Sequence, residues 1–275
     1  MSIIIYHNPD CGTSRNVLAM LREAGEDLCV IEYLKTPPDR ATLERIITDT
    51  GLAVRDILRI KGTPYAELGL DDAALTDAQL IDAMLVHPML INRPIVVTPR
   101  GTRLCRPSDA VVDVLAHAPE REMLKEDGVP FIVARAIPGD DATFVQTMRD
   151  AQLPVDDLSE PGRAFFKFST LAGVHIGYGG FERYGSDALV RSIVVASGHR
   201  GMGIGRNLLF VLLHEAFDAG ARTAWLLTTD TSAFFEKTGF RAVMREAAPP
   251  TILMTQQACT LCPASAVLMS RAITL

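Results

Sequence analysis

A charged, irregular stretch near the middle of the chain constrains its fold more than any other feature. Between Leu115 and Pro130 the sequence reads AHAPEREMLKEDGV, with a proline and a glycine, and a new apolar strand pattern follows it. A chain of 275 residues also exceeds the usual size of one small domain. We therefore predict two domains, residues 1–117 and 129–275, joined by a linker at 118–128.

The composition is that of a folded protein from a reducing compartment. Hydrophobic residues make up 48% and charged residues 22% of the chain, near the averages for globular domains. A net charge of -6 argues against nucleic-acid binding, which depends on clustered lysine and arginine. The apolar stretches are too short to cross a membrane, and no signal-peptide pattern precedes the first strand. Five cysteines, an odd number, do not suggest a secreted disulfide framework, so we expect a cytoplasmic protein.

The beginning of the chain predicts a strand, a loop and a helix, with a cysteine at the turn. The run SIIIY is followed by HNPD and then by apolar residues at helical spacing as far as Gly25. Cys11 should therefore lie at the N-terminus of the helix, with Thr13 or Ser14 near the cap. The unpaired N–H groups there favour a thiolate and an incoming oxyanion. The alternative is that Cys11 is a small buried residue.

The rest of the first half continues this strand and helix pattern. A hairpin is expected near its end, preceded by Arg93-Pro94. Cys29 and Cys105 fall inside apolar strand patterns and are interpreted as packing residues. The predicted elements are a strand at 28–33, helices at 40–50 and 76–86, and strands at 95–98 and 103–106.

Four segments of this half, HNPDCGTSRN, DILR, HPMLINRPIVVTP and GTRLCRPSD, resemble the glutaredoxin-coupled arsenate reductase family (ArsC). The resemblance covers residues 2–117 and implies a thioredoxin-like fold with a cis Arg93-Pro94 bond. It also implies a site for arsenate, because forked guanidinium groups bind such an oxyanion in a bidentate way. Any single arginine, by contrast, is most simply a solvated surface charge. The implied site residues are a nucleophilic Cys11, His7 tuning its thiol, and Arg59, Arg93 and Arg106 around the oxyanion.

The resemblance further implies a mechanism that needs external thiols. The Cys11 thiolate attacks arsenic, after which glutathione attacks and glutaredoxin resolves the adduct to arsenite. Position 14 is serine, so the motif is C-x-x-S and lacks a resolving cysteine. Arsenate, glutathione and glutaredoxin are therefore the expected substrate, co-substrate and partner.

A glycine-rich loop is the most informative feature of the second half. An apolar strand at 188–196 runs into GHRGMGIGR, and a helix follows at 207–219. Glycines at a helix start let backbone N–H groups approach a pyrophosphate closely. A flexible connecting loop explains the glycines equally well, and the spacing is not that of a Rossmann fingerprint. The other predicted elements are strands at 131–137, 165–168, 174–178 and 223–229 and a helix at 140–151.

The arrangement R-x-x-G-x-G at Arg200, Gly203 and Gly205 resembles the acetyl-CoA loop of GNAT acetyltransferases. FERYG, RSIVV, LLTTDTSAFFEKTGF, AAPPTI and LCPASAVLM resemble the arsenic-resistance branch of that family, over residues 131–273. The fold class implied for the whole chain is α/β (α+β), a thioredoxin-like domain followed by a GNAT domain. The implied acetyl-CoA ligands are Ile193, Val194 and Val195 for the pantetheine, and Arg200, Gly201, Met202, Gly203, Ile204, Gly205 and Arg206 for the pyrophosphate.

The chemistry of the second half is less fully specified. The acceptor is an unknown amine, and Glu182 is the candidate general base. Many GNAT enzymes place a general-acid tyrosine where this chain has Phe234 and Phe235. That departure keeps open a CoA-binding or arsenic-binding module without transferase activity.

Two further alternatives concern metal binding and regulation. Cys259 and Cys262 form a single C-x-x-C, only half a zinc site, so we expect no metal and interpret them as packed thiols on a terminal strand. The match around Cys262 also suggests a role in sensing arsenite. Regulatory relatives of the reductase fold bind RNA polymerase, but they usually carry C-x-x-C and lack the oxyanion arginines. Ser14 and the three arginines therefore favour catalysis.

Overall fold

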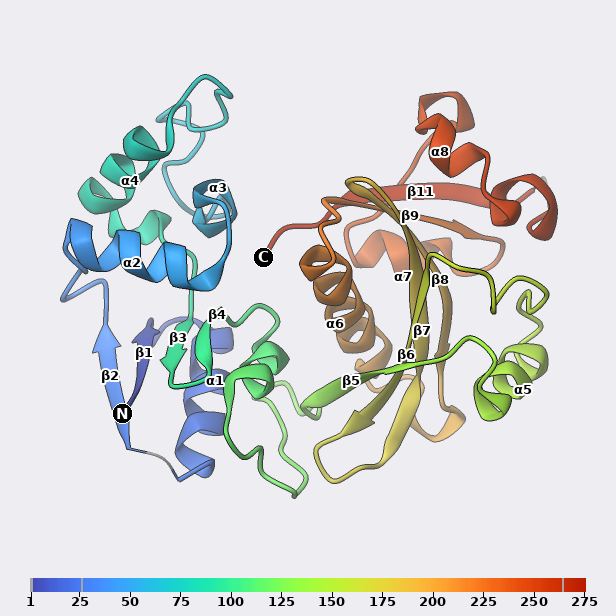
Figure 1. Ribbon diagram of the computed structural model, residues 1–275, viewed down its shortest axis with the longest axis horizontal. Coiled ribbons are helices and arrows are strands. Elements are labelled where there is room, and N and C mark those ends of the chain that lie inside the picture. The colour runs from blue at the N-terminus through green and yellow to red at the C-terminus, as the bar shows by residue number, and fades with distance from the viewer. Residues whose placement is uncertain (1, 26, 264) are drawn as a thin grey trace. The chain divides into compact units, whose positions relative to one another are not determined.

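The computed structural model describes residues 2–25, 27–263 and 265–275. The chain divides into two compact units, one ending at Phe131 and including Leu275, the other running from Ile132 to Thr274 (Figure 1). Each unit contains one β-sheet with helices packed against it, which is the mixed α/β architecture predicted. No helix in the described part of the chain is long and apolar enough to cross a membrane.

The first unit is built on a four-stranded sheet in the order β2-β1-β3-β4. β1 and β2 are parallel, whereas β3 pairs antiparallel with β1 and β4. The βαβα beginning, the hairpin and the cis Arg93–Pro94 bond before it all agree with the prediction, and the Arg106–Pro107 bond is cis as well. The elements are β1 (Ile3–His7), α1 (Gly12–Glu23), β2 (Leu28–Glu32), α2 (Arg40–Thr50), α3 (Val54–Ile57), α4 (Asp77–Val86), η1 (Pro88–Leu90), β3 (Ile95–Thr98), β4 (Gly101–Leu104) and η2 (Ser108–Val114).

Local signals explain where the helices of this unit begin and end. The Asp39 side chain caps α2 by accepting a hydrogen bond from the Thr42 N–H at 2.8 Å. Gly51, with φ 69°, adopts the left-handed conformation that ends the same helix. α4 begins with a capping box between Thr76 and Gln79. The apolar faces of α2, α3 and α4 then form one buried cluster with side chains of the sheet.

Residues 118–128 belong to the first unit and are not the predicted linker. Lys125 is buried there and forms an ion pair with buried Asp109 at 2.6 Å. The charged composition of the segment suggested an exposed connection, but Arg121, Lys125 and Glu126 form ion pairs within the unit. The boundary lies instead after Phe131, where the chain enters β5 (Ile132–Ile137) of the second unit.

Two predictions about the strands of the first unit need correction. β4 ends at Leu104, so Cys105 and Arg106 follow the strand and strand alternation does not apply to them. Cys105 is nevertheless buried, as predicted, and its N–H donates to the Pro94 carbonyl at 2.9 Å. Cys29 is exposed, contrary to the prediction, because β2 is an edge strand whose middle residues face solvent.

The second unit is built on a seven-stranded sheet in the order β10-β11-β9-β8-β7-β6-β5. Neighbouring strands are antiparallel except β8 and β9, which are parallel. The predicted strands and helices are present, and β6 and β7 are longer than expected. After β5 the elements are α5 (Ala142–Asp150), β6 (Arg163–Thr170), β7 (His175–Tyr184), β8 (Asp187–Val195), η3 (Ser197–His199), α6 (Ile204–Asp218), β9 (Thr223–Thr228), α7 (Ser232–Lys237), β10 (Arg241–Ala242), η4 (Arg245–Ala247), α8 (Pro250–Leu253), η5 (Gln257–Leu261) and β11 (Val267–Ala272).

Helices α5 and α6 cover opposite faces of this sheet. On one face Phe144 of α5 packs against the rings of Phe165 and Tyr178, at centroid distances of 4.8 and 5.4 Å. On the other face α6 approaches the backbone at Gly179, where an added Cβ would lie only 3.0 Å from a methyl carbon of Leu212. Tyr178 and Gly179 are consecutive in β7, so they face opposite sides of the sheet, and so do the two helices that contact them.

Strands β8 and β9 diverge after a short paired segment. Their ladder joins Asp187–Leu189 with Thr223–Trp225, and no further pairing between them occurs among the described residues. The second half of β8 remains paired with β7 on its other side. It therefore keeps one edge without a strand partner among the described residues, here called the free edge, and the Val195 carbonyl accepts a hydrogen bond from Arg200 Nε at 3.0 Å.

Candidate functional site

Cys11 lies at the N-terminus of α1, as predicted, at the end of the loop that joins β1 to this helix. It is the N-cap residue, with extended backbone dihedrals, and its carbonyl accepts from the Arg15 N–H at 3.0 Å. Its own N–H donates to the Asn8 carbonyl at 3.1 Å, which fixes the loop. The side chain is half-buried. The first N–H groups of a 12-residue helix therefore lie next to the sulfur.

The three predicted arginines converge on Cys11 from three different loops. Arg106 is within hydrogen-bonding reach of the sulfur, and its Nη1 also donates to the Arg93 carbonyl at 3.2 Å. Arg93 is 9% exposed, and its Nε has no hydrogen-bond partner among the described residues. Burial and repulsion between the neighbouring guanidinium groups lower the pKa of Arg59 and of Arg106. A cluster of like charges of this kind can hold an anion, which would relieve the repulsion between the guanidinium groups.

The thiol of Cys11 is more acidic than an ordinary cysteine. Burial opposes ionisation, but the Ser14 N–H and hydroxyl and the charges of Arg93 and Arg106 together lower the pKa of Cys11. The Ser14 hydroxyl has no hydrogen-bond partner of standard geometry among the described residues, so we attribute the shift mainly to the N–H group and the guanidinium groups. A larger fraction of the thiol is therefore reactive thiolate at neutral pH.

His7 lies beside this cluster but is not shown to act on the sulfur. It ends β1, is 5% exposed and pairs in register with Glu32 of β2. Burial lowers the pKa of His7, and the Glu32 carboxylate and a backbone contact with Ser14 only partly oppose that effect. The imidazole is therefore neutral at pH 7. Its predicted role in tuning the thiol stays a prediction.

Tyr33 is a residue of this site that the sequence analysis missed. It is 1% exposed, donates its hydroxyl to the Ile91 carbonyl at 3.2 Å, and lies within the electrostatic reach of Cys11 and the arginines. Burial raises the pKa of Tyr33, so its hydroxyl is a donor. One signal could have revealed it. β1 and β2 are parallel, so the residues following both strands meet at one edge of the sheet.

The glycine-rich loop of the second unit leads into the N-terminus of α6, as the strand, loop and helix pattern predicted. α6 is a 15-residue helix whose N-cap, Gly203, has φ 78°, a left-handed conformation that favours glycine. No side chain caps this helix end among the described residues, so its first N–H groups are available to a ligand. An added Cβ at Gly205 would lie 3.4 Å from a methyl carbon of Val195, so this turn of the helix lies beside the end of β8. Ile204 is buried and can offer only its backbone.

The three residues predicted to contact pantetheine are the last of β8, on the free edge described above. Val194 and Val195 pair with β7 and are half-buried. Just before them Ser192, with φ 57°, forms a bulge in which it and Ile193 lie opposite Gly179. No sequence signal indicated this bulge, because serine rarely adopts a positive φ.

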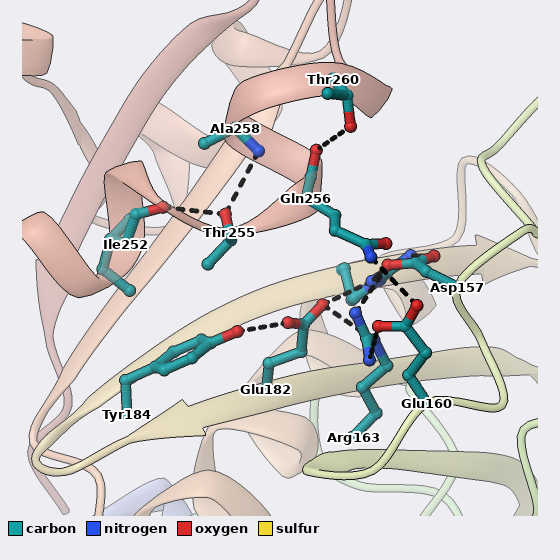
Figure 2. A network of polar contacts seen from close by, with 11 residues as sticks. Asp157, Glu160, Arg163, Glu182, Tyr184, Ile252, Thr255, Gln256, Ala258 and Thr260 are labelled. Atoms are coloured by element: carbon teal, nitrogen blue, oxygen red, sulfur yellow. Dashed lines mark hydrogen bonds and ion pairs between the residues drawn. The ribbon is translucent and has the colours of Figure 1, made fainter.

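A buried cluster of charged side chains lies across β6, β7 and β8 (Figure 2). Arg191 Nη2 donates to the Asp157 carboxylate at 2.6 Å, and Nη1 contacts both Asp157 and Glu182. Arg163 donates to Asp157 at 3.0 Å and lies 3.3 Å from Glu182. The Tyr184 hydroxyl donates to the second oxygen of Glu182 at 2.6 Å. We refer to these five residues as the ion cluster.

These contacts argue against the predicted role of Glu182 as a general base. Both of its oxygens already accept hydrogen bonds from cationic or hydroxyl donors, and the residue is 3% exposed. Burial and the hydrogen bond to Glu182 raise the pKa of Tyr184 to about 12. Each oxygen of Glu182 therefore already has a donor, and its role as a general base stays a prediction.

The cysteines near the C-terminus are not packed on a strand, contrary to the prediction. Both precede β11, on or just after η5; Cys259 is exposed and its thiol lies 3.0 Å from the Leu253 carbonyl. Cys262 is half-buried, and burial raises its pKa. No group of three or more metal-binding side chains occurs among the described residues. The suggested LCPASAVLM motif includes Ala264, which lies outside those residues.

Comparisons with known proteins assign each unit separately. The ArsC family pattern matches residues 6–114, and the acetyltransferase (GNAT) family pattern matches residues 134–240. The arsenate reductase of Rhizobium meliloti is 59% identical over 128 residues, 46% of this chain and 91% of that protein. A solved arsenate reductase from Vibrio cholerae is 45% identical over 42% of this chain and 98% of its own, with a TM-score of 0.41.

For the second unit, a solved GNAT-family acetyltransferase from Staphylococcus aureus is 16% identical over 52% of this chain and 99% of its own, with a TM-score of 0.39. The Rhizobium relative is matched over nearly its whole length at high identity. The chain thus belongs to the ArsC family through its first unit, and its second unit is a domain of the GNAT acetyltransferase family.

Proposed function

We propose that the first unit reduces arsenate to arsenite in the cytoplasm, with Cys11 as the nucleophile. The observation that carries the proposal is the meeting of an acidified thiol with the guanidinium groups of Arg59, Arg93 and Arg106. Such a site suits a tetrahedral oxyanion with one or two negative charges. The names of the relatives, which are arsenate reductases, support arsenate as that oxyanion.

The reaction balances with two external thiols. The Cys11 thiolate attacks arsenic, an As–S bond forms, and one arsenate oxygen leaves as water after protonation. A glutathione thiol then displaces a second oxygen in the same way. The glutaredoxin thiolate attacks the glutathione sulfur, and the resulting mixed disulfide accounts for the two electrons that arsenic gains. Water releases arsenite and the free Cys11 thiol. Ser14 stands where a resolving cysteine would be, which is why outside thiols are needed.

A coupled assay tests this function. Purified protein is mixed with glutathione, glutaredoxin, glutathione reductase and NADPH, and arsenate-dependent NADPH oxidation is measured. We expect activity that disappears when glutaredoxin is left out. Activity sustained by thioredoxin alone would replace the proposed reductant, and no activity with any reductant would contradict the proposed function.

Replacing Arg106 by lysine should weaken the reaction while preserving the charge. Lysine cannot reproduce the forked contact with an oxyanion, and loss of one hydrogen bond to a charged group costs about 1.5–3 kcal/mol. We expect kcat/KM for arsenate to fall about 10- to 150-fold in Arg106→Lys, given about 1.4 kcal/mol per factor of ten. The control is Arg100→Lys in the exposed β3–β4 turn, which should be unchanged. Equal values for both variants would contradict a role for Arg106 at the oxyanion.

We infer that the second unit binds acetyl-CoA. When bound, this group supplies a thioester as the acyl donor for an amine acceptor. The uncapped start of α6 would hold the pyrophosphate, and the free edge of β8 at Ile193–Val195 would pair with the amides of the pantetheine. The left-handed Gly203 fits this use, because glycine adopts that conformation without strain.

Gly203→Ala should therefore weaken CoA binding. Alanine is strained at φ 78°, by roughly 1–2 kcal/mol, and the turn can relieve that strain by moving. We expect the Kd for CoA, measured by titration calorimetry, to rise about 5- to 30-fold. Gly185→Ala is the matched control, because Gly185 has a similar φ of 62° but lies in the β7–β8 turn. A similar rise in both variants would show a general loss of stability instead.

A second candidate is a unit that binds CoA without transferring the acyl group. Two observations favour this candidate. Both oxygens of Glu182 already accept hydrogen bonds, and Phe234 and Phe235 have no group that could act as a general acid. Phe235 is buried against Phe240, at a ring distance of 5.7 Å. Measuring CoA binding together with acetyl transfer to amine-bearing arsenicals separates the two. Binding without turnover on any amine would favour this candidate.

A further inference from the structure

The segment Arg121–Phe131, here called the strap, packs against the first turn of α1 beside Cys11. The Glu126 carboxylate accepts two hydrogen bonds from Arg15, from Nε at 2.6 Å and from Nη2 at 2.8 Å. The Glu126 N–H donates to the Asn16 side chain at 3.0 Å. An added Cβ at Gly12 would lie 3.4 Å from a Glu126 oxygen, so the carboxylate lies directly beside the residue that follows the cysteine.

Arg15 also donates a hydrogen bond to the loop that precedes Cys11, so it connects Glu126 with that loop. Its third nitrogen, Nη1, donates to the Pro9 carbonyl at 2.6 Å. Pro9 lies between Asn8, whose carbonyl accepts from the Cys11 N–H, and Cys11 itself. One guanidinium group thus joins the strap to the loop, through bonds from all three of its nitrogens. The Glu126 carboxylate, 111 positions along the chain from Arg15, thereby holds the backbone before the cysteine.

The strap is also anchored next to the oxyanion arginines. Lys125 forms its buried ion pair with Asp109, three residues after Arg106, at 2.6 Å. The ammonium group also lies over the Phe131 ring, 5.3 Å from its centroid. The buried pair of Lys125 and Asp109 fixes the backbone of the strap. The position of Glu126, the next residue, is therefore fixed as well, although its own side chain is exposed.

We propose that Glu126 is a positioning residue for Cys11 and acts through Arg15. It keeps the loop from Asn8 to Cys11 in the conformation in which the Ser14 N–H and the helix end face the sulfur. Glu126 touches neither the thiol nor the substrate. The significance of this role for catalysis rests on the reductase function proposed above, but the effect on the thiol does not.

The sign of one measurement separates positioning from simple electrostatics. Removing a negative charge near a thiol lowers its pKa, because the thiolate is then repelled less. Loss of the loop conformation raises the pKa, because the thiolate loses its N–H contact. In Glu126→Gln we therefore expect the apparent pKa of Cys11 to rise, and its alkylation by iodoacetamide at pH 7 to slow about threefold or more.

The experiment measures alkylation of the Cys11 peptide by mass spectrometry as a function of pH, so the other cysteines do not interfere. Glu126→Asp should restore much of the wild-type rate, and Glu122→Gln, an exposed change on the same strap, should match wild type. Melting temperatures should be the same for all variants. An unchanged or lower pKa in Glu126→Gln would overturn the proposal.

Arsenate reduction is measured on the same proteins. A slower thiol in Glu126→Gln together with no arsenate reduction even in wild type would keep the positioning role and reject the reductase function. The expected result is a fall in kcat that follows the lost thiolate fraction, with a smaller change in KM for arsenate, because the arginines remain in place.

Discussion

Cys11→Ser is expected to lower arsenate-dependent NADPH oxidation at least about 1,000-fold, to the background of the coupling enzymes. A serine hydroxyl at the same helix end is not ionised at neutral pH, because its pKa lies far above that of a thiol. The helix N-terminus and the guanidinium groups of Arg93 and Arg106 stabilise a thiolate, but they cannot make a serine alkoxide abundant. The measurement is the coupled assay described above.

The controls for this substitution are the two other cysteines of the first unit. Cys29 is exposed on an edge strand, so Cys29→Ser should keep full activity. Cys105 is fully buried, and burial strongly raises its pKa, so it remains a neutral thiol. Cys105→Ser should cost stability and leave the pH dependence of the reaction unchanged. Loss of activity in Cys29→Ser comparable to that in Cys11→Ser would contradict the assignment of the nucleophile.

Arg191→Met is expected to destabilise the second unit by about 3–5 kcal/mol, the usual cost of removing one partner from a buried ion pair. The Arg191 and Asp157 side chains are each 1% exposed, and Glu182 shares the same guanidinium group. Methionine fills similar volume but leaves two carboxylates with Arg163 as their remaining cation. The single tryptophan, Trp225, is buried in β9, so its fluorescence during urea unfolding reports on this unit alone.

The matched control is Arg183→Met, which removes an exposed guanidinium group from the neighbouring strand β7 and should change stability by less than about 0.5 kcal/mol. If both variants unfold at the same urea concentration, the ion cluster contributes no more than a surface charge. That outcome would also remove the argument against Glu182 as a general base.

The ion cluster should also make the second unit sensitive to acid. Burial opposes the ionisation of Asp157, but its contacts with Arg191 and Arg163 hold its pKa below the ordinary value of 3.8. The folded unit therefore binds this proton less readily than the unfolded chain does. The stabilisation is complete above the unfolded pKa, at about pH 4, and is lost as the pH falls through the folded pKa. Tryptophan fluorescence should show a weaker dependence on acid in Asp157→Asn.

Features that depend on a few neighbouring residues were determined by the sequence itself. The bounds of α2 and α4 follow from Asp39, Gly51 and the capping box at Thr76, all close to the helix ends. The position of Cys11 at a helix start and the turn at Gly203 follow in the same way. The family motifs then correctly identified both units, because they preserve this local geometry together with the side chains that use it.

Burial and charge pairing were decided only by the tertiary structure. Tyr33 joins the thiol site because two parallel strands end together, and Cys29 is exposed because its strand lies at the edge of the sheet. Glu182 pairs with Arg191 because β7 and β8 are neighbours in the sheet, and with Tyr184 two residues further along β7. The segment predicted as a linker packs on the first unit because Lys125 and Glu126 find partners in Asp109 and Arg15. The sequence around a charged side chain does not indicate which distant residue it will pair with, because that depends on how the sheets and helices pack.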